Sequence, residues 1–402
     1  AYEWRQRKLT DVRDDMYNGQ TPSRNKSEYW NGNIKWLSSG ELNRGTVYDS
    51  MEMITEDGQK SANLRIVPKG TFIMAITGLE AAGTRGNCAL LGFDTTLNQS
   101  CMALFPKKDL LTSDFLFQWY RKVGEEYGIN YTQGTKQQSY NAELIKILPI
   151  SLPSVAEQRK IASYLSNLDH LITLHQRKCD EVKSLKKYML QKMFPQNEQK
   201  VPEIRFEGFT DPWEQRKFGD LVEKYEDPVV TPTEGYTRLG IRSHAKGTFH
   251  SYVEKGKELE TAKMFRVASD KFIVNITFGW EHAVAITDEN DAGKLVSHRF
   301  PQYSFNAGMI PKFFRYLILD KKFKHHLELS SPGGAGRNRV LKLSDMLEYK
   351  MNFPCEEEQR KIAAYFDDLD HLITLHQRKP IPHPDHPTIH TKHKGEEKYV
   401  RI

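Results

Sequence analysis

The sequence predicts an α+β protein in which two strand-rich globular domains alternate with two long helices. The first observation is an internal repeat: the phrase Glu-Gln-Arg-Lys-Ile-Ala begins at Glu157 and again at Glu358, 201 residues later in a chain of 402. The second is that each copy continues with the spacing of a long amphipathic helix. The third is that short strand and turn patterns fill the stretch before each copy. A period this long excludes a solenoid and indicates a duplicated half.

The first copy predicts a helix from Ser154 to Phe194. Ser154 and Glu157 match the capping-box pattern of a helix start, and Pro195 ends the helical pattern. Apolar residues recur at alternating steps of four and three, which is the spacing of a heptad seam. A single core helix is the alternative, but the pattern far exceeds the usual length of about 11–12 residues and favours a coiled coil. The predicted seam residues are Ile161, Leu165, Leu168, Ile172, Ile362, Leu369 and Ile373.

The domains before the helices alternate short apolar runs with turn residues, as strand-rich folds do. Residues 70–77 and their counterpart 270–277 each predict a buried strand, and aromatic-rich helices are predicted at 114–122 and 312–320. The prolines and histidines of the last segment predict disorder, with metal binding as the alternative. The predicted boundaries are 1–153 and 201–353 for the globular domains, 154–200 and 354–379 for the helical regions, and 380–402 for the tail.

Composition limits the class of protein. No run approaches the 18–20 apolar residues of a membrane span, and we expect no secretory leader. The four cysteines lack CxxC spacing, which is typical of free thiols in a cytoplasmic protein. The net charge of +6 permits an anionic partner such as nucleic acid without requiring one.

Polar, glycine-rich stretches close both domains just before the repeated helix, at 133–141 and 331–339, and similar clusters occur at 84–87 and 238–250. Glycine allows a backbone to approach a ligand, and Arg, Lys, Asn and Gln contact phosphates and base edges. A solvated surface loop is the alternative for each stretch alone. The candidate DNA-binding residues are Arg85, Asn87, Lys136, Gln137, Gln138, Arg242, His244, Lys246, Arg337, Asn338 and Arg339.

Motifs of catalysis are missing from the sequence. It contains neither a GxxxxGK[ST] phosphate loop nor the Asn-Pro-Pro-aromatic motif of amino-methyltransferases. His170 and His175, and their copies His371 and His376, lie on predicted helices without ligand-like neighbours, so we interpret them as interface or surface groups. The chain is predicted to bind a partner rather than to catalyse a reaction.

At this point the layout resembles the specificity subunit of a type I restriction–modification system. Two dissimilar strand-rich domains alternate with two near-identical segments that carry EQRKIA and LDHLITLHQRK, and the resemblance extends over nearly the whole chain up to Lys379. The turn from Gly19 to Ser23 is similar to the GxTPS turn common at the start of this family's target recognition domains. Residues 238–249 resemble one recurrent type of such a domain.

The resemblance implies that the two helices pack as an antiparallel coiled coil in a pseudo-twofold relation. Each target recognition domain would read one half of a bipartite site on double-stranded DNA in the major groove, and the helices would fix the spacer. Two methyltransferase subunits would dock on the helices and flip an adenine with S-adenosylmethionine, and two ATP- and Mg-dependent restriction subunits would complete the complex. It also implies no cofactor, metal or catalytic residue in this chain. The shortened second helix, which ends at Pro380, puts part of the predicted pairing in doubt.

Two alternatives from other classes stay open. A nuclease or self-sufficient modification enzyme with an unfamiliar site would be active as the purified chain. A coiled-coil scaffold without DNA binding would show no salt-dependent affinity for DNA, whereas a DNA-binding protein loses affinity steeply with salt.

Overall fold

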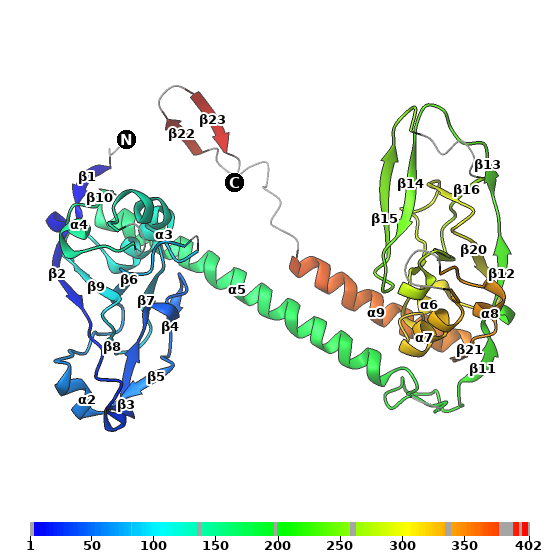
Figure 1. Cartoon of the computed structure of the whole chain (residues 1–402), viewed down its shortest axis with the longest axis horizontal. Helices are drawn as coiled ribbons and strands as arrows, with labels where there is room; N and C mark the ends of the chain where they lie inside the picture. The colour runs from blue at the N-terminus through cyan, green and yellow to red at the C-terminus, as the bar shows by residue number, and fades with distance from the viewer. Residues whose placement is uncertain are drawn as a thin grey trace. The chain divides into compact units, whose positions relative to one another are not determined.

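A computed structural model of the chain forms two compact units, residues 1–173 and 174–402 (Figure 1). In the part of the chain that the structure describes, no helix combines the length and the apolar character needed to cross a membrane. The described residues are 4–81, 83–134, 138–196, 199–257, 263–333, 339–377, 389–393 and 396–400.

The first unit is built on two sheets and a strand pair that closes the domain. The larger sheet has the order β2 (Arg13–Asn18), β9 (Cys101–Pro106), β6 (Phe72–Ala75), β7 (Cys88–Leu91) and β4 (Thr46–Val47). The smaller sheet has the order β5 (Glu52–Ile54), β3 (Trp30–Leu37) and β8 (Thr96–Leu97). The closing pair is β1 (Arg5–Lys8) with β10 (Pro149–Leu152), and the short helices are α1 (Leu9–Val12), η1 (Ser27–Tyr29), η2 (Ser39–Glu41), α2 (Glu56–Ser61) and α4 (Ala142–Lys146).

The core of the first unit lies between its larger sheet and the helix α3 (Ser113–Asn130). All four residues of β6 are buried, as expected for the strand predicted at 70–77. Thr112 begins α3, because its side chain accepts a hydrogen bond from the Phe115 N–H. The Tyr120 ring of α3 meets the Phe72 ring of β6 edge to face at 5.6 Å, which joins the helix to the middle of the sheet.

The second unit repeats this plan with different sheets. Its four-stranded sheet has the order β12 (Val222–Tyr225), β20 (Gln302–Phe305), β17 (Lys271–Val274) and β18 (Val284–Ile286). Its five-stranded sheet has the order β13 (Pro228–Val229), β16 (Met264–Arg266), β19 (Leu295–Ser297), β14 (Tyr236–Ile241) and β15 (Thr248–Val253). The closing pair is β11 (Glu214–Lys217) with β21 (Lys350–Phe353), and the helices are η3 (Phe218–Asp220), η4 (Gly279–Glu281), α6 (Pro311–Leu317), α7 (Lys321–Leu329) and α8 (Leu343–Leu347).

The two repeated phrases form α5 (Val155–Lys192) and α9 (Glu356–Gln377). The Ser154 hydroxyl accepts a hydrogen bond from the Glu157 N–H at 3.3 Å, which confirms the predicted start of the first helix. In the second unit α9 packs on the C-terminal part of α5 in antiparallel order. His175 contacts His376, whereas Lys186, further along α5, pairs with the earlier residue Asp370 of α9.

The contact between His175 and His376 indicates a local twofold axis between α5 and α9. Their Nδ1 atoms lie 3.1 Å apart, and the two residues occupy the same position in the repeated phrase. A residue meets its own counterpart only where a symmetry axis passes between two paired elements. The pseudo-twofold antiparallel pairing implied by the resemblance is therefore present in the second unit.

The seam is shorter than the heptad pattern predicts. Ile362 and Leu369 are buried with Val182 and Met193, and Ile373 packs partly against the same core. Leu168 and Ile172 are 38% and 56% exposed, so they do not belong to a covered seam in this structure. Because α9 ends at Gln377, its length covers only the C-terminal part of α5. Of the other predicted positions, Leu165 is half-buried, and Ile161 is half-buried and packs on the core of the first unit.

The tail differs in part from the predicted disorder. Residues 389–393 form β22 (Ile389–His393), which pairs antiparallel with β23 (Glu396–Val400). These two segments contain Ile, Thr, Tyr and Val, which favour strands, and they lie after the last proline of the tail. The proline-rich part from 380 to 388 lies outside the described residues.

Candidate nucleic-acid interface

A buried glutamine fixes the start of α5 to the first domain. The Thr112 N–H, at the start of α3, donates to Gln158 Oε1 at 3.0 Å. The Gln158 amide nitrogen in turn donates to the carbonyls of Leu110 at 2.8 Å and Pro153 at 3.0 Å. Gln158 is fully buried, so these bonds satisfy its amide away from water. The helix is thereby held at a fixed place on the domain.

The second copy of the phrase makes the same set of bonds. The Ile310 N–H, at the start of α6, donates to Gln359 Oε1 at 3.0 Å. Gln359 Nε2 donates to the carbonyls of Pro354 at 2.9 Å and Gly308 at 3.3 Å, and this side chain is also fully buried. Sequence reasoning missed Gln158 and Gln359. Their repetition at the head of both helices was a signal that could have identified them.

Both polar stretches that precede the helices are also held in the same way. In the first unit the Tyr140 N–H donates to the carbonyl of Ile76 at 2.9 Å, just beyond β6. In the second unit the Leu341 N–H donates to the carbonyl of Ile276 at 2.8 Å, just beyond β17. The repeat thus brings each stretch to the end of the central strand of its own domain.

In the first unit, Arg85 and Gln138 come together around Glu80. Arg85 Nη2 donates to the Glu80 carbonyl at 2.7 Å, and the Gln138 N–H donates to the Glu80 carboxylate at 3.3 Å. The Arg85 stem packs close to Gly128 of α3, where an added Cβ would lie 3.0 Å from Arg85 Cβ. Arg85 Nε and Gln138 Oε1 are buried and have no hydrogen-bond partner. Two clusters that are about fifty residues apart in sequence therefore form one polar site.

The remaining first-domain candidates are placed less fully. Asn87 is half-buried, and its carbonyl accepts a hydrogen bond from the Ala75 N–H at 2.9 Å at the end of β6. Lys136 and Gln137 lie outside the described residues. The role of all five first-domain candidates in DNA binding stays a prediction.

In the second unit, Arg242 begins the turn between β14 and β15. Its N–H donates to the Gly247 carbonyl at 2.9 Å, and its guanidinium donates to the carbonyl of Thr248. The guanidinium carbon lies 5.3 Å from the centre of the Phe249 ring, within reach of a cation–π contact. The turn therefore presents an exposed cation whose position is fixed by its own hairpin.

The tip of this turn rests on η4. The His244 N–H donates to the Glu281 carbonyl at 2.9 Å, and the Ala245 N–H donates to the His282 carbonyl at 2.8 Å. His244 and Ala245 both have positive φ, a tight conformation that exposes the His244 and Lys246 side chains. Burial lowers the pKa of the His282 imidazole, whose Nε2 lies 2.8 Å from the Ile318 carbonyl.

Arg339, from the second polar stretch, meets the same η4 segment. Its guanidinium lies 5.4 Å from the centre of the Trp280 ring, and it donates to the carbonyls of Ser331 at 3.1 Å and Glu328 at 3.3 Å. It therefore satisfies carbonyls at the C-terminal end of α7. Arg337 and Asn338 lie outside the described residues.

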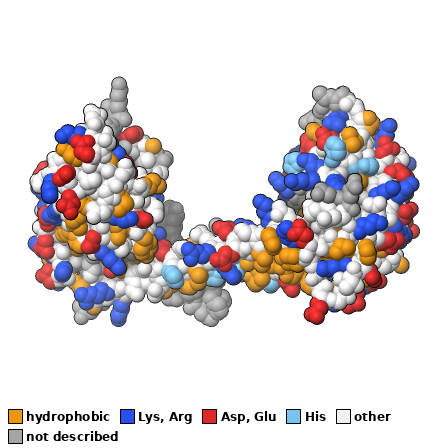
Figure 2. All heavy atoms as spheres, turned by 90° about the horizontal axis from the view of Figure 1, so that it is seen from below, with side chains coloured by type: hydrophobic (Ala, Val, Ile, Leu, Met, Phe, Trp, Pro, Cys, Tyr) orange, Lys and Arg blue, Asp and Glu red, His pale blue; other side chains and the backbone are white. Residues whose placement is uncertain are grey.

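His250 is a further residue of this surface that the candidate residues do not include. Its Nε2 lies 2.8 Å from Oδ1 of Asp291, a buried carboxylate that also accepts a hydrogen bond from the Thr248 hydroxyl at 2.9 Å. Figure 2 shows Lys and Arg side chains in blue and His side chains in pale blue close together on the globular part of the second unit. The surface can therefore donate hydrogen bonds to an anion.

The chain is a duplicated protein made of two related α+β units. In each unit a buried glutamine fixes the domain to one helix of the pseudo-twofold pair. Each half also carries a polar loop surface. The family model "Type I restriction modification DNA specificity domain" matches residues 2–184 and 210–381. The chain belongs to this family.

Comparison with known proteins agrees with this assignment. The chain is 29% identical over 231 residues to the type I restriction enzyme MjaIX specificity subunit of Methanocaldococcus jannaschii, a match that covers 55% of this chain and 52% of the relative. It is 27% identical over 161 residues to a type I restriction enzyme specificity subunit of Escherichia coli, with 39% of this chain and 38% of the relative covered. These matches thus span about half or less of both relatives.

The fold has a solved counterpart. The crystal structure of the S subunit of a type I restriction–modification system from M. genitalium matches with a TM-score of 0.54 at 14% sequence identity. The match covers 93% of this chain and 91% of that one. At this low sequence identity the match establishes a similarity of fold alone. The predicted α+β class with two domains and paired helices is confirmed.

Proposed function

We propose that this chain is the DNA-recognition subunit of a type I restriction–modification complex, in which each unit reads one half of a bipartite site on double-stranded DNA. The chain itself carries no catalytic residue in this proposal. Two methyltransferase subunits supply methylation with S-adenosylmethionine, and two restriction subunits supply ATP- and Mg-dependent translocation and cleavage. The helices α5 and α9 set the spacer and dock the methyltransferases.

The observation that carries this proposal is the equivalent placement of two dissimilar polar loops. Tyr140 and Leu341 tie the two loops to the same position in the two domains, just before the anchored helices. The loops differ in sequence, whereas the anchors repeat. A protein that reads two different half-sites in one geometry needs this combination, since its variable side chains must contact base edges while its frame keeps the spacing.

A salt titration tests DNA binding by the second unit. Lys246 is exposed on the β14–β15 turn and forms no ion pair with the described residues. If Lys246 contacts a phosphate, Lys246→Ala should weaken binding evenly across sequences and reduce the slope of log K against log salt by about 1. Lys255, which pairs with Glu234 at 2.9 Å, is the matched control and should leave the slope unchanged when replaced by alanine.

A half-site assay tests sequence recognition. Duplexes enriched from a random pool by the assembled complex would be varied in one half-site at a time. Arg337→Ala should cost about 1–3 kcal/mol on the second half-site only. Equal affinity of this variant and the parent protein for all half-site variants would contradict the assignment of Arg337.

Assembly is tested by co-expression with the products of neighbouring genes and native mass spectrometry. One copy of this chain with two methyltransferase subunits is the expected particle. Nuclease or methyltransferase activity of the purified chain alone would instead favour a self-sufficient enzyme. Absence of any salt-dependent DNA binding would favour a scaffold.

A further inference from the structure

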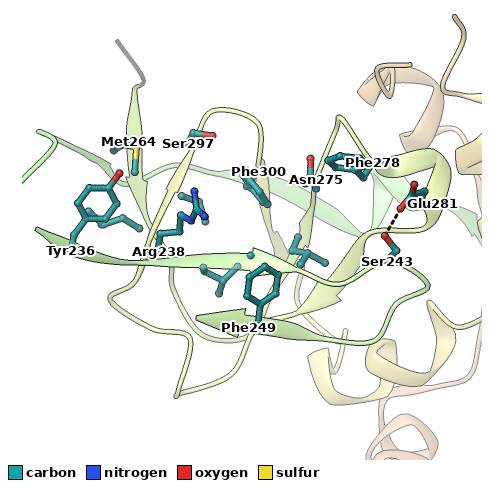
Figure 3. Close-up of a pocket in the computed structure, with 15 residues that line it drawn as sticks. Tyr236, Arg238, Ser243, Phe249, Met264, Asn275, Phe278, Glu281, Ser297 and Phe300 are labelled. Atoms are coloured by element: carbon teal, nitrogen blue, oxygen red, sulfur yellow. Dashed lines mark hydrogen bonds between the residues drawn. The ribbon is translucent and has the colours of Figure 1, made fainter. Parts of the chain in front are cut away.

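The second unit has a half-open cavity of about 370 Å³ beside the β14–β15 hairpin (Figure 3). Tyr236, Arg238 and Met264 gather at one end of it, Phe300 lies in the middle, and Asn275 lies towards the other end. The volume falls in the range of small-molecule sites, about 300–1,000 Å³. The cavity adjoins the hairpin whose turn carries the exposed candidate residues, but none of those residues lines it.

The Tyr236 side chain is one of the enclosed polar groups in the lining of this cavity. Tyr236 is 6% exposed, and its hydroxyl is buried without a hydrogen-bond partner among the described residues. A buried hydroxyl without a partner costs about 1–3 kcal/mol, so natural proteins rarely retain one unless something satisfies it. Figure 3 shows this side chain among those that line the cavity.

Further polar groups around the cavity are only partly used. Arg238 donates through Nε to the Ser251 hydroxyl at 3.0 Å, and its two Nη groups make no hydrogen bond to the described residues. Asn275 Oδ1 accepts a hydrogen bond from the Thr277 N–H at 3.0 Å, which leaves its amide NH2 as a donor. Ser297 lines the cavity with a hydroxyl for which the described residues offer no hydrogen-bond partner. Donors therefore converge on the cavity from several strands.

The walls between these groups are largely aromatic. Phe249, Phe278 and Phe300 line the cavity with Tyr236. Phe249 lies directly across from Gly240 in the strand pair, and its ring covers that glycine so closely that an added Cβ would come within 2.3 Å. Aromatic faces favour stacking with planar ring systems, which an aliphatic ligand cannot provide.

We propose that this cavity binds a nucleobase. A purine or pyrimidine is a planar ring with acceptors along its edge, which suits aromatic walls with converging Asn, Ser, Tyr and Arg donors. The base has two possible sources, a free nucleotide or a base turned out of the bound duplex. The second source rests on the proposed function. A bound duplex next to the β14–β15 turn would lie beside this cavity, and Arg238 would then face the sugar–phosphate side of the base.

The test uses the full chain and two probes. The first arm titrates the chain with each of the four nucleoside 5′-monophosphates by isothermal calorimetry. The second arm places 2-aminopurine at successive positions of an enriched duplex and follows its fluorescence, which rises when a base leaves the stack. Tyr236→Phe and Ser297→Ala should each lower the affinity measured in the arm that responds about five-fold, because each removes one hydrogen bond to the base. Tyr303→Phe, a buried tyrosine outside the cavity, should change neither arm.

Stability provides the folding control. The Tyr236 hydroxyl makes no hydrogen bond to the described residues, so Tyr236→Phe should not lower the free energy of unfolding. Binding in the first arm identifies a free nucleotide as the source, and a response in the second arm alone identifies a base from the duplex.

The inference is overturned if neither the calorimetric titration nor the fluorescence responds. It is also overturned if Tyr236→Phe gives the same response as the parent protein. If duplexes bind but neither arm responds, the inference fails while the proposed function stands. If no duplex binds, the proposed function fails while the first arm still decides the inference.

Discussion

The two units use the same glutamine in the same way, yet the glutamate that precedes it has different surroundings in each. Glu157 is half-buried, and its backbone N–H bonds to Ser154. Glu358 is fully buried and accepts two hydrogen bonds from Arg205, at 2.7 and 2.8 Å. The hydrogen bonds to Glu358 raise the pKa of the Arg205 guanidinium.

The two helix starts share their bonds to the backbone but differ in their bonds to other side chains. Gln158 and Gln359 bond to the backbone of their own domains, so any sequence that preserves the local path of the chain preserves those bonds. Arg205 lies outside the repeated helix phrase, in residues 201–206 ahead of β11. The Glu358 pair therefore depends on a side chain from another segment, and Glu157 has no ion pair within the described chain.

The largest expected effect separates the two glutamates. Glu358→Ala would leave the Arg205 cation buried without its partner, and loss of one member of a buried pair costs about 3–5 kcal/mol. Glu157→Ala is the matched control and should cost less than about 0.5 kcal/mol. Hydrogen exchange measured by mass spectrometry in α9 and in the start of α5 reports each unit separately. Equal destabilisation by both changes would contradict the comparison.

A double substitution sharpens the same point. If burial of the two charges costs as much as their attraction returns, Arg205→Met combined with Glu358→Leu should recover most of the stability lost in the single variant. Additive losses in the double variant would mean that the pair is net stabilising in this position.

The next effect should be equal in the two units. Gln158→Ala exposes no new surface but leaves the Thr112 N–H and the Pro153 carbonyl without their bonds, and Gln359→Ala does the same to Ile310 and its neighbours. Each change should cost about 1–3 kcal/mol. Urea unfolding followed by pulse proteolysis, with fragments assigned to each unit, measures both. A large effect in one unit only would show that the anchors are not equivalent.

Much of the frame could be predicted from the sequence because it depends on local patterns. Periodicity and Ser154 placed α5 within two residues of its observed ends, and the buried strand predicted at 270–277 contains β17. The burial of Gln158 was not predicted, because a glutamine between charged residues suggests a solvated face. Only tertiary contacts show that it is buried. The shortened seam followed from Pro380, which the sequence did reveal, but the exposure of Leu168 depends on where α9 lies.

The candidate site was less predictable because its residues meet through the fold. Arg85 and Gln138 share Glu80, and the turn around His244 shares η4 with Arg339, although neither pair is close in sequence. Composition could mark each loop as polar, but only the strand order brings the loops together. Whether these side chains contact DNA stays a prediction.

The smallest expected effect is a pH dependence confined to the second unit. Burial lowers the pKa of His282 below its ordinary value of 6.5. As the pH falls past that value, the unfolded chain takes up a proton that the folded chain does not, so stability decreases towards acid, by at most about 1.4 kcal/mol per pH unit for one proton. His170 is the only histidine in residues 1–173 and is exposed on α5, so the first unit has no buried histidine to produce such a change between about pH 7 and pH 5.5.

His282→Asn isolates this effect from the loss of packing. His282 has a φ of +61°, and asparagine tolerates that conformation better than most residues. The variant should be less stable at every pH, because it loses the contact with the Ile318 carbonyl, but its stability should vary less with pH than that of the parent protein. Urea unfolding of each unit across this pH range measures both quantities. An unchanged pH dependence in the variant would contradict the assignment of this effect to His282.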